Sequence, residues 1–177
     1  MADNFIRTVP QGDNRQRLVC QDCGYIEYKN PKVVVAALCT WMDDDQEKFL
    51  LCKRAIEPRL GYWTIPAGYM ELNESTAEGA ARETWEEAQA KVEVGGLLGL
   101  YDIPHIGQVY VVYQARMTER VFGAGEESLE VDLFAWDDIP WDELAFPSVR
   151  WALEHYRTGT GAAVGVAPPR PPRVEKS

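Results

Sequence analysis

The segment at residues 68–90 reads G-Y-M-E-L-N-E-S-T-A-E-G-A-A-R-E-T-W-E-E-A-Q-A and holds the most specific pattern in the chain. Ser75 and Glu78 have the spacing of a capping box, in which two side chains satisfy the first free amides of a helix. Small side chains then recur at helical spacing, which predicts a face suited to close packing. This face consists of Ala77, Ala80, Ala81, Thr84 and Ala88. We therefore predict a turn followed by a helix.

The predicted helix carries more carboxylates than its own stability favours. In residues 74–87 a single Arg82 stands against Glu74, Glu78, Glu83, Glu86 and Glu87. Like charges four residues apart destabilise a helix by about 0.2–0.5 kcal/mol, and anions near its C-terminus oppose the helix dipole. One interpretation is a solvated acidic face, relieved by Arg82 pairing with Glu78 or Glu86. The other is a divalent cation, because clustered carboxylate oxygens are the ligands of Mg²⁺ or Mn²⁺.

Length and composition indicate one compact domain with small appendages. The chain has 177 residues, of which 46% are hydrophobic and 11% aromatic, enough for a core. Its formal net charge of -10 argues against broad binding to nucleic acids or to an anionic membrane. A small anionic substrate stays compatible with this charge, since bound cations reverse the local field. The chain shows no signal-peptide core and no apolar run that spans a bilayer, so we expect a cytoplasmic protein with reduced cysteines.

The polar lead-in contains a C-x-x-C-G turn at Cys20 and Cys23, which is half of a zinc knuckle. A closed structural zinc site needs four ligands, and no second pair occurs in the sequence. Zinc at Cys20 and Cys23 is therefore the less favoured interpretation, and a redox role less favoured still, because no thioredoxin-like pattern surrounds the pair. Cys39 and Cys52 stand singly in apolar runs and are expected to be buried structural thiols.

The remainder of the chain reads mainly as strands. Residues 32–41 and 48–53 are β-branched or apolar runs on either side of an Asp43-Asp44-Asp45 turn, which predicts a hairpin. Further strands are predicted at residues 62–66, 91–103, 108–117 and 129–136, and a second helix at 146–157. The Gly, Ala and Pro-rich tail at 158–177 is expected to be disordered. Strands on both sides of a carboxylate helix indicate an α+β fold with a mixed sheet between helical layers.

At this point the residues carry a family resemblance. Gly68, Glu74 and the run from Arg82 to Glu87 resemble the Nudix box, G-x5-E-x7-R-E-U-x-E-E-x-G-U, with every charged position at the right spacing. Two positions depart from it: Thr84 fills an aliphatic position, and Gln89 replaces the final Gly. A non-Gly residue in a left-handed helix cap costs on the order of 1 kcal/mol, unless the turn is reshaped. Either way we expect an effect on stability and retained chemistry.

The resemblance extends over roughly residues 7–157, including V-P-Q-G-D, L-L-C-K-R and W-T-I-P-A-G-Y. Over this range the chain is similar to the zinc-ribbon-containing subgroup of Nudix hydrolases, which acts on ADP-ribose or FAD. The expected fold is a Nudix-type α/β/α sandwich at residues 31–157. A zinc-ribbon-like segment at 1–30, lacking the first Cys pair, would precede it. Either the natural start lies upstream, or this member has lost the metal and kept the scaffold.

The resemblance implies a pyrophosphatase that depends on two or more Mg²⁺ or Mn²⁺ ions and hydrolyses a nucleoside diphosphate linked to another moiety. By box position the metal ligands would be Glu83, Glu86 and Glu87, with the Ala67 carbonyl as a further oxygen. Gly68, Glu74 and Arg82 would be structural. An additional glutamate commonly precedes the last strand, and Glu127 is the first candidate for it and Glu130 the second.

Substrate choice is less defined. The resemblance favours ADP-ribose or FAD with release of AMP, and Pro104 is placed like a proline of ADP-ribose hydrolases. The S-Q-P-W-like array of NADH-cleaving relatives is missing, yet NADH and nucleoside triphosphates stay as alternatives. Arg54 is a candidate for a phosphate, and Tyr62, Trp63 and Tyr69 are candidates for stacking on a ring. A nucleotide-sensing module without turnover is the alternative from another class. Homodimerisation is expected from the family.

Overall fold

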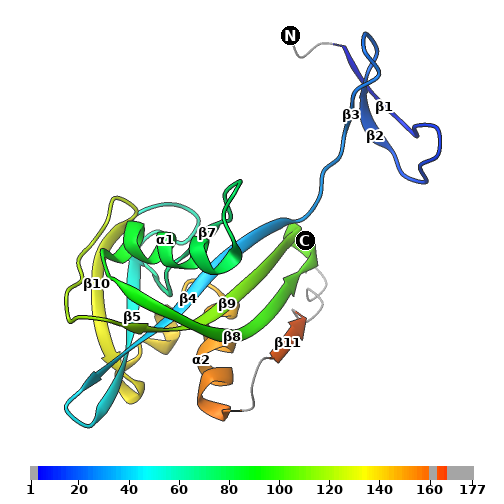
Figure 1. Cartoon of the computed structure of the whole chain (residues 1–177). Helices are drawn as coiled ribbons and strands as arrows, with labels where there is room; N and C mark the ends of the chain where they lie inside the picture. The colour runs from blue at the N-terminus through cyan, green and yellow to red at the C-terminus, as the bar shows by residue number, and fades with distance from the viewer. Residues whose placement is uncertain (1–3, 160–162, 167–177) are drawn as a thin grey trace, which may run out of the picture. The chain divides into compact units, whose positions relative to one another are not determined.

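The computed structural model describes residues 4–159 and 163–166. Contacts divide the chain into two compact units, Met1–Pro31 and Lys32–Ser177 (Figure 1). The first unit is a three-stranded antiparallel sheet of β1 (Phe5–Thr8), β2 (Arg17–Cys20) and β3 (Ile26–Glu27). Its β1–β2 loop is held by Asp13, which accepts hydrogen bonds from the Arg17 side chain and the Asn14 amide at 2.9 and 2.7 Å.

The second unit is built on one mixed sheet in the order β10-β5-β4-β9-β8-β11. β4 pairs antiparallel with β5 and parallel with β9, and two short strands, β6 and β7, pair with β5 and β4. The strands are β4 (Lys32–Asp43), β5 (Gln46–Arg54), β6 (Trp63–Thr64), β7 (Ala67–Tyr69), β8 (Val92–Ile103), β9 (Gln108–Met117), β10 (Ser128–Ala135) and β11 (Ala163–Val166). The helices are α1 (Thr76–Ala88), α2 (Pro147–Thr158) and the 3-10 turns η1 (Pro104–Ile106), η2 (Trp136–Asp138) and η3 (Trp141–Glu143).

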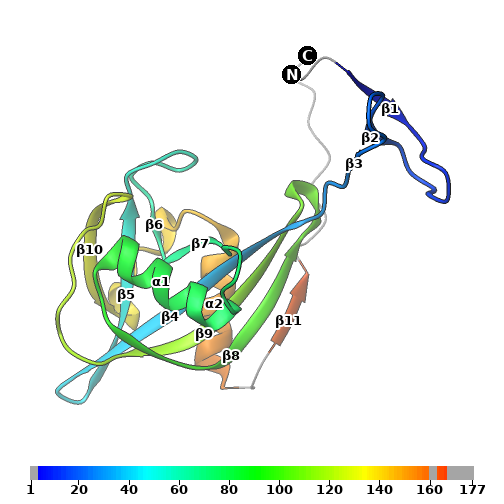
Figure 2. The ribbon, with the colours of Figure 1, turned by 45° about the horizontal axis from the view of Figure 1, so that its top comes forward.

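The two long helices lie on opposite faces of this sheet (Figures 1 and 2). Successive side chains of a strand point to opposite faces, and β4 follows this rule. Val35, Ala37 and Cys39 pack with Ala80 and Ala88 of α1. Ala36 and Leu38 pack with Val149, Ala152 and Leu153 of α2. The expected α+β sandwich with a mixed sheet is therefore confirmed, and its centre is buried on both faces.

Helix α1 forms as its sequence predicts. Ser75 and Glu78 make both bonds of the capping box, with Ser75 N–H donating to the Glu78 carboxylate at 2.8 Å and Glu78 N–H donating to Ser75 Oγ at 3.2 Å. Gln89 itself takes the left-handed cap conformation, with φ 49°, and its amide donates to the Trp85 carbonyl at 2.9 Å. The turn is thus the ordinary left-handed cap, formed without glycine.

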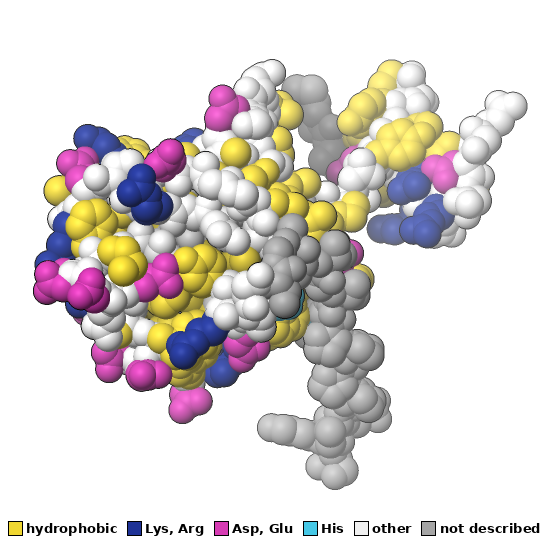
Figure 3. Space-filling view, turned by 60° about the horizontal axis from the view of Figure 1, so that its bottom comes forward, with side chains coloured by type: hydrophobic (Ala, Val, Ile, Leu, Met, Phe, Trp, Pro, Cys, Tyr) yellow, Lys and Arg dark blue, Asp and Glu magenta, His cyan; other side chains and the backbone are white. Residues whose placement is uncertain are grey.

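The C-terminal segment differs in part from the expected disorder. Residues 163–166 form β11, which pairs parallel with β8, while residues 160–162 and 167–177 lie outside the described residues. Cys39 and Cys52 are buried free thiols, as expected. Figure 3 shows acidic and basic side chains interspersed with apolar ones over one face. None of the helices in the described part of the chain has the length and apolar character needed to cross a membrane.

Candidate functional site

A cavity of about 900 Å³ lies where α1, α2 and several loops of the second unit meet. The acidic residues of its lining, here called the acidic end, are Glu83, Glu86, Glu87, Glu126 and Glu127. The apolar and aromatic residues, here called the apolar end, are Ile103, Ile106, Tyr110, Phe146, Val149 and Trp151. Arg54 connects the two sets, because its guanidinium lies 5.2 Å from the Phe146 ring and its charge acts on Glu87. A charged group and a flat apolar group of one ligand would therefore both find complementary surroundings in the same cavity.

Arg82 is the hub of the acidic end. Its guanidinium binds both carboxylate oxygens of Glu74 at 2.9 Å and donates to Glu83 and Glu86 at 2.8 Å each. It also donates to the Tyr69 carbonyl at 3.1 Å, which ties the loop before α1 to the helix. This bidentate pairing, helped by the Glu71 amide, lowers the pKa of Glu74 to about 2.

Glu83 lies against the backbone of β7. A Cβ added to Gly68 would stand 2.2 Å from the Glu83 carboxyl carbon, so any larger residue would displace the Glu83 carboxylate from this position. Glu83 is 9% exposed, and its burial raises its pKa, opposed by the charge of Arg82. The glycine therefore admits a carboxylate to a largely dry position beside the strand.

Glu87 is the most buried acid of the site, at 5% exposure. One of its oxygens accepts a hydrogen bond from the Ala67 amide at 3.0 Å. Burial, together with the charges of Glu83 and Glu127, raises the pKa of Glu87 to about 8, although the Ala67 hydrogen bond and the charge of Arg54 act to lower it. Glu86, by contrast, is exposed. The helix thus presents three carboxylates that differ strongly in solvation.

The loop before β10 is fastened to the C-terminal end of α1. The amides of Gly123 and Gly125 donate to the carbonyls of Ala88 and Glu87 at 2.8 and 3.0 Å, satisfying acceptors that a helix end leaves free. The Gln89 side chain reaches the Ala124 carbonyl at 3.4 Å. This docking holds Glu126 and Glu127 at the cavity wall.

The two candidate loop acids lie in different places. Glu127 lines the cavity, and its charge acts on both Glu83 and Glu87. Glu130 lies on β10, pairs with Lys53 at 3.5 Å and is not among the residues that line the cavity. Glu126 lines the cavity too, although the sequence did not single it out.

The four residues predicted as substrate contacts also lie in different places, two in the lining of the cavity and two outside it. Arg54 and Tyr69 line the cavity. Arg54 donates to the Pro58 carbonyl at 2.9 Å, while Lys32 lies 4.3 Å from the Tyr69 ring. Trp63 is not available for stacking on a substrate ring, which corrects the prediction. Its side chain is only 6% exposed and packs edge-on against Phe134 in the core, with 4.9 Å between the ring centroids. Tyr62 lies beneath Arg59 and is likewise not among the described lining residues.

The sequence pattern did not predict the residues of the apolar end. Phe146, Ser148 and Trp151 come from the start of α2, and Tyr110 comes from β9, where burial raises the pKa of its hydroxyl. None of them belongs to a local motif. The helical spacing at 146–157 predicted packing on the sheet, but only the three-dimensional fold shows that the first turn of α2 also faces the cavity.

The donor set fits a divalent cation, although its carboxylates do not converge on one point here. In the described residues, no group of three or more His, Cys, Asp or Glu side chains is arranged around a common metal position. Arg82 engages one oxygen each of Glu83 and Glu86, and the Ala67 amide engages one of Glu87. The second oxygen of each carboxylate is left for a hard cation. The acidic face is therefore partly relieved by Arg82, which pairs with Glu86 as one interpretation predicted, and with Glu74 and Glu83 instead of Glu78.

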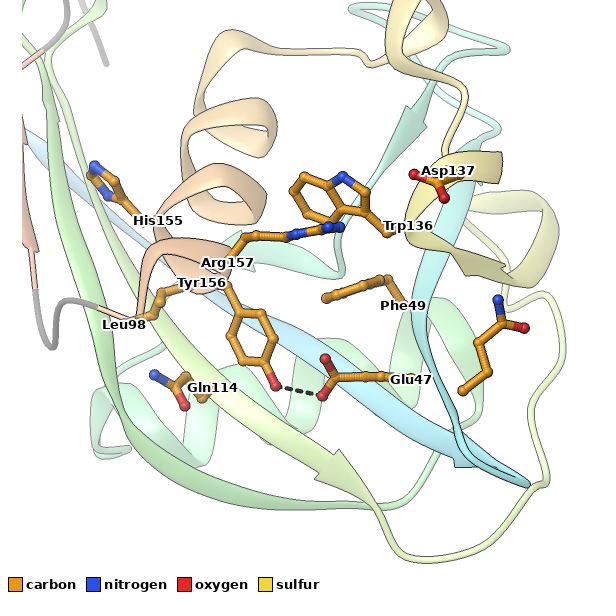
Figure 4. A pocket seen from close by; sticks show the side chains of 11 residues that line it. Glu47, Phe49, Leu98, Gln114, Trp136, Asp137, His155, Tyr156 and Arg157 are labelled. Carbon is orange, nitrogen blue, oxygen red and sulfur yellow. Dashed lines mark hydrogen bonds between the residues drawn. The ribbon is translucent and has the colours of Figure 1, made fainter.

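A second cavity of about 660 Å³ lies beside the C-terminal half of α2 (Figure 4). Several of its polar groups already have partners. The Tyr156 hydroxyl donates to Glu47 at 2.6 Å, His155 Nδ1 and the Tyr101 hydroxyl are 2.9 Å apart, and Arg157 stacks 4.5 Å from the Trp136 ring. This cavity offers aromatic walls and satisfied hydrogen bonds, without a carboxylate cluster.

Comparison with known proteins identifies relatives of both units. The NUDIX domain model matches residues 32–154, and the Nudix N-terminal zinc-ribbon model matches residues 4–29. A MutT-like protein of Streptomyces ambofaciens is 35% identical over 79 residues, which are 45% of this chain and about half, 51%, of that protein. An ADP-ribose pyrophosphatase of Methanocaldococcus jannaschii is 27% identical over 143 residues, covering 77% of this chain and 80% of that protein.

Solved structures agree with this relationship. A crystal structure of a NUDIX hydrolase from Nitrosomonas europaea superposes with a TM-score of 0.84 at 43% identity, over 92% of this chain and 93% of that one. The NUDIX domain of Shewanella oneidensis NrtR, solved with ADP ribose, shares the fold, with a TM-score of 0.64 at 23% identity over 75% of this chain and 90% of its own. The expected resemblance is confirmed, and the chain belongs to the Nudix family of hydrolases.

Proposed function

We propose that this chain is a Mg²⁺- or Mn²⁺-dependent pyrophosphatase that hydrolyses ADP-ribose or FAD and releases AMP. The observation that carries the proposal is the single cavity that joins buried Glu83 and Glu87 to an apolar, aromatic end. A diphosphate between two organic groups matches this division. The similarity to an ADP-ribose pyrophosphatase supports the choice of substrate class.

The residues of the chain have distinct tasks in this reaction. Glu83, Glu86 and Glu87 would hold the cations, with the Ala67 carbonyl as a further oxygen. When bound, Mg²⁺ or Mn²⁺ would neutralise the diphosphate and lower the pKa of a water molecule. Water then adds to one phosphorus and the bridging oxygen leaves on the other, so that ADP-ribose yields AMP and ribose 5-phosphate.

Two further side chains support the reacting group. Glu127 lies close enough for its charge to act on Glu83 and Glu87, which suits a group that takes a proton from the attacking water. Arg54 has one guanidinium donor bound to Pro58 and four more for a phosphate oxygen. Arg82 and Glu74 hold the loop and the helix together and do not need to touch the substrate.

The test is incubation of the full chain with ADP-ribose, FAD, NADH and a nucleoside triphosphate, each with Mg²⁺ or Mn²⁺, followed by identification of the products. We expect AMP from ADP-ribose or FAD at the highest rate. Release of AMP from NADH alone would move the assignment to that substrate. If neither AMP nor phosphate were released under any condition, the hydrolase proposal would be overturned in favour of nucleotide sensing.

A further inference from the structure

β11 directs the chain toward the rim of the large cavity. It pairs parallel with β8, and its last residue, Val166, lies opposite Asp102 (Figures 1 and 2). β8 ends at Ile103, which follows Asp102 and lines the cavity, and the next element, η1, contributes further lining residues. Because the two strands are parallel, the chain leaves β11 in the direction in which β8 approaches the cavity. Residues 167–177 are therefore attached to the fold beside the cavity.

The sequence of residues 167–177 is rich in proline and basic residues. It reads A-P-P-R-P-P-R-V-E-K-S, with Arg170, Arg173 and Lys176 against Glu175. Its side chains carry a formal charge of +2 in a chain whose net charge is -10. We call residues 167–177 the basic segment.

The cavity carries the opposite charge. Glu57 and Glu71 line it in addition to the five carboxylates of the acidic end. Arg54 and Arg82 are the only Lys or Arg side chains in the described part of its lining, and Arg82 is already bound to three carboxylates. A further guanidinium that reached this lining would be held by charge and by hydrogen bonds to carboxylate oxygens.

The apolar end suits the prolines of the same segment. Tyr110, Phe146 and Trp151 belong to it, and proline-rich segments are bound in proteins by grooves lined with aromatic side chains. Proline also lowers the entropy that a segment loses on binding, because its ring fixes φ. The cavity thus combines the aromatic and acidic side chains that recognise a segment of proline and arginine.

The point of attachment brings the basic residues within reach of the cavity. An extended chain spans at most about 3.6 Å per residue, so the Cα of Arg170 lies within about 14 Å of Val166 and that of Arg173 within about 25 Å. A segment tethered this closely has an effective concentration in the millimolar range. A contact with a dissociation constant of about 1 mM is then already about half occupied.

We propose that the basic segment docks in the cavity of its own chain when no cation is bound there. Its prolines lie against the apolar end, and Arg170 and Arg173 lie against the carboxylates. The segment and the metal ion compete for the same negative charges, so the chain limits its own metal binding. This inference rests on the proposed function only for the assignment of the metal ligands, and it adds a tethered competitor to them.

The first test is Mn²⁺ binding to the full chain at low ionic strength, measured by the EPR signal of free Mn²⁺. A competitor that leaves between a half and a tenth of the sites free raises the apparent dissociation constant about 2- to 10-fold. The double variant Arg170→Gln, Arg173→Gln should therefore bind Mn²⁺ more tightly than the parent by that factor.

The matched control is Lys91→Gln, Arg116→Gln, which removes the same charge from exposed positions near the opposite ends of β8 and β9. It should bind Mn²⁺ as the parent does. Equal affinities of the two double variants would overturn the proposal. A difference between them that disappears on dilution of the protein would assign the contact to a second copy and overturn docking within one chain.

Trypsin gives a second readout that needs neither turnover nor metal. It cleaves after Arg173 but not after Arg170, because Pro171 follows Arg170. Cleavage after Arg173, followed by mass spectrometry, should be slower in the full chain than in a free peptide of residues 167–177. Mn²⁺, or NaCl at about 1 M, where the Debye length is about 3 Å, should reduce this difference.

The two readouts separate this proposal from the proposed function. A ratio of the two cleavage rates that neither Mn²⁺ nor NaCl changes would overturn docking of the segment. A parent that binds no Mn²⁺, but whose cleavage NaCl accelerates relative to the peptide, would refute the assignment of the metal ligands alone.

Discussion

Glu87 combines burial, a backbone hydrogen bond and like-charged neighbours in one side chain. Glu87→Gln keeps its size and its Ala67 bond while removing the charge that a cation needs. We expect this change, and Glu86→Gln likewise, to lower kcat by several orders of magnitude without lowering the melting temperature. Glu130→Gln, outside the cavity, should leave kcat unchanged. Near-normal turnover of either box variant would refute its assignment as a metal ligand.

The pKa of Glu87 predicts how the stability of the protein depends on pH when a chelator keeps metal ions out of the site. A folded-state pKa of about 8, above the ordinary 4.5, means that the folded protein binds this proton more tightly than the unfolded chain does. The contribution is fully present below about pH 4.5 and is lost as pH rises through about 8. Urea unfolding at several pH values should show this decline in the parent and a smaller one in Glu87→Gln, in which the raised pKa of Glu83 still contributes. Glu93→Gln is the control, because Glu93 forms an exposed ion pair that links β8 and β9. The stability of this variant should decline with rising pH as that of the parent does.

Gly125 is the point of closest approach between the loop and α1. A Cβ added there would lie 1.7 Å from the Glu86 carbonyl oxygen, a backbone atom that cannot turn away. Gly125→Ala should therefore displace the loop that carries Glu127 and lower kcat roughly 100-fold, as misplacement by about 1 Å can. Gly96→Ala is the matched control, since nothing lies within 4 Å of its added Cβ. Equal kcat for both variants would show that the docked loop does not matter for turnover.

At the scale of the element, the cap of α1 carries the departure at Gln89. Glycine takes a left-handed conformation without strain, so Gln89→Gly should stabilise the protein by up to about 1 kcal/mol. For a chain of this size that raises Tm by roughly 2–4 °C. The lost contact to Ala124 is long, at 3.4 Å, so kcat should stay within about threefold of the parent. A lower Tm in a thermal melt would mean that the side-chain contact outweighs the backbone strain.

The same element shows how far local sequence determines structure. The capping box and the small face of α1 were predictable because their partners lie three or four residues apart. The partners of Arg82 were less predictable from local sequence, because its bonds to Glu74 and to the Tyr69 carbonyl depend on how the preceding loop folds back. Trp63 shows the limit, since its place in the core is set by Phe134, which lies on β10 far along the chain.

At the scale of the molecule, strand runs and the order of helices gave the sandwich, but the cavity required the tertiary fold. Its acidic end comes from a local motif, and its apolar end is assembled from β8, β9, η1 and the start of α2. The hydrophobic pattern of α2 predicts a packed helix, and Phe146 and Trp151 look like core residues in that pattern. Phe146 comes to lie 5.2 Å from the guanidinium of Arg54, at the end of β5, only when the start of α2 packs against the sheet.

The N-terminal unit raises the last question at this scale, whether the chain binds zinc. The amides of Cys23 and Asp22 lower the pKa of Cys20, which favours the thiolate that zinc binds. Two thiolates are only half of a closed site, and in residues 4–159 and 163–166 no third His, Cys, Asp or Glu completes the set. We expect elemental analysis of the dialysed protein to find well below one zinc per chain, unchanged in Cys20→Ser. One zinc per chain that Cys20→Ser abolishes would show a complete site and refute the half ribbon.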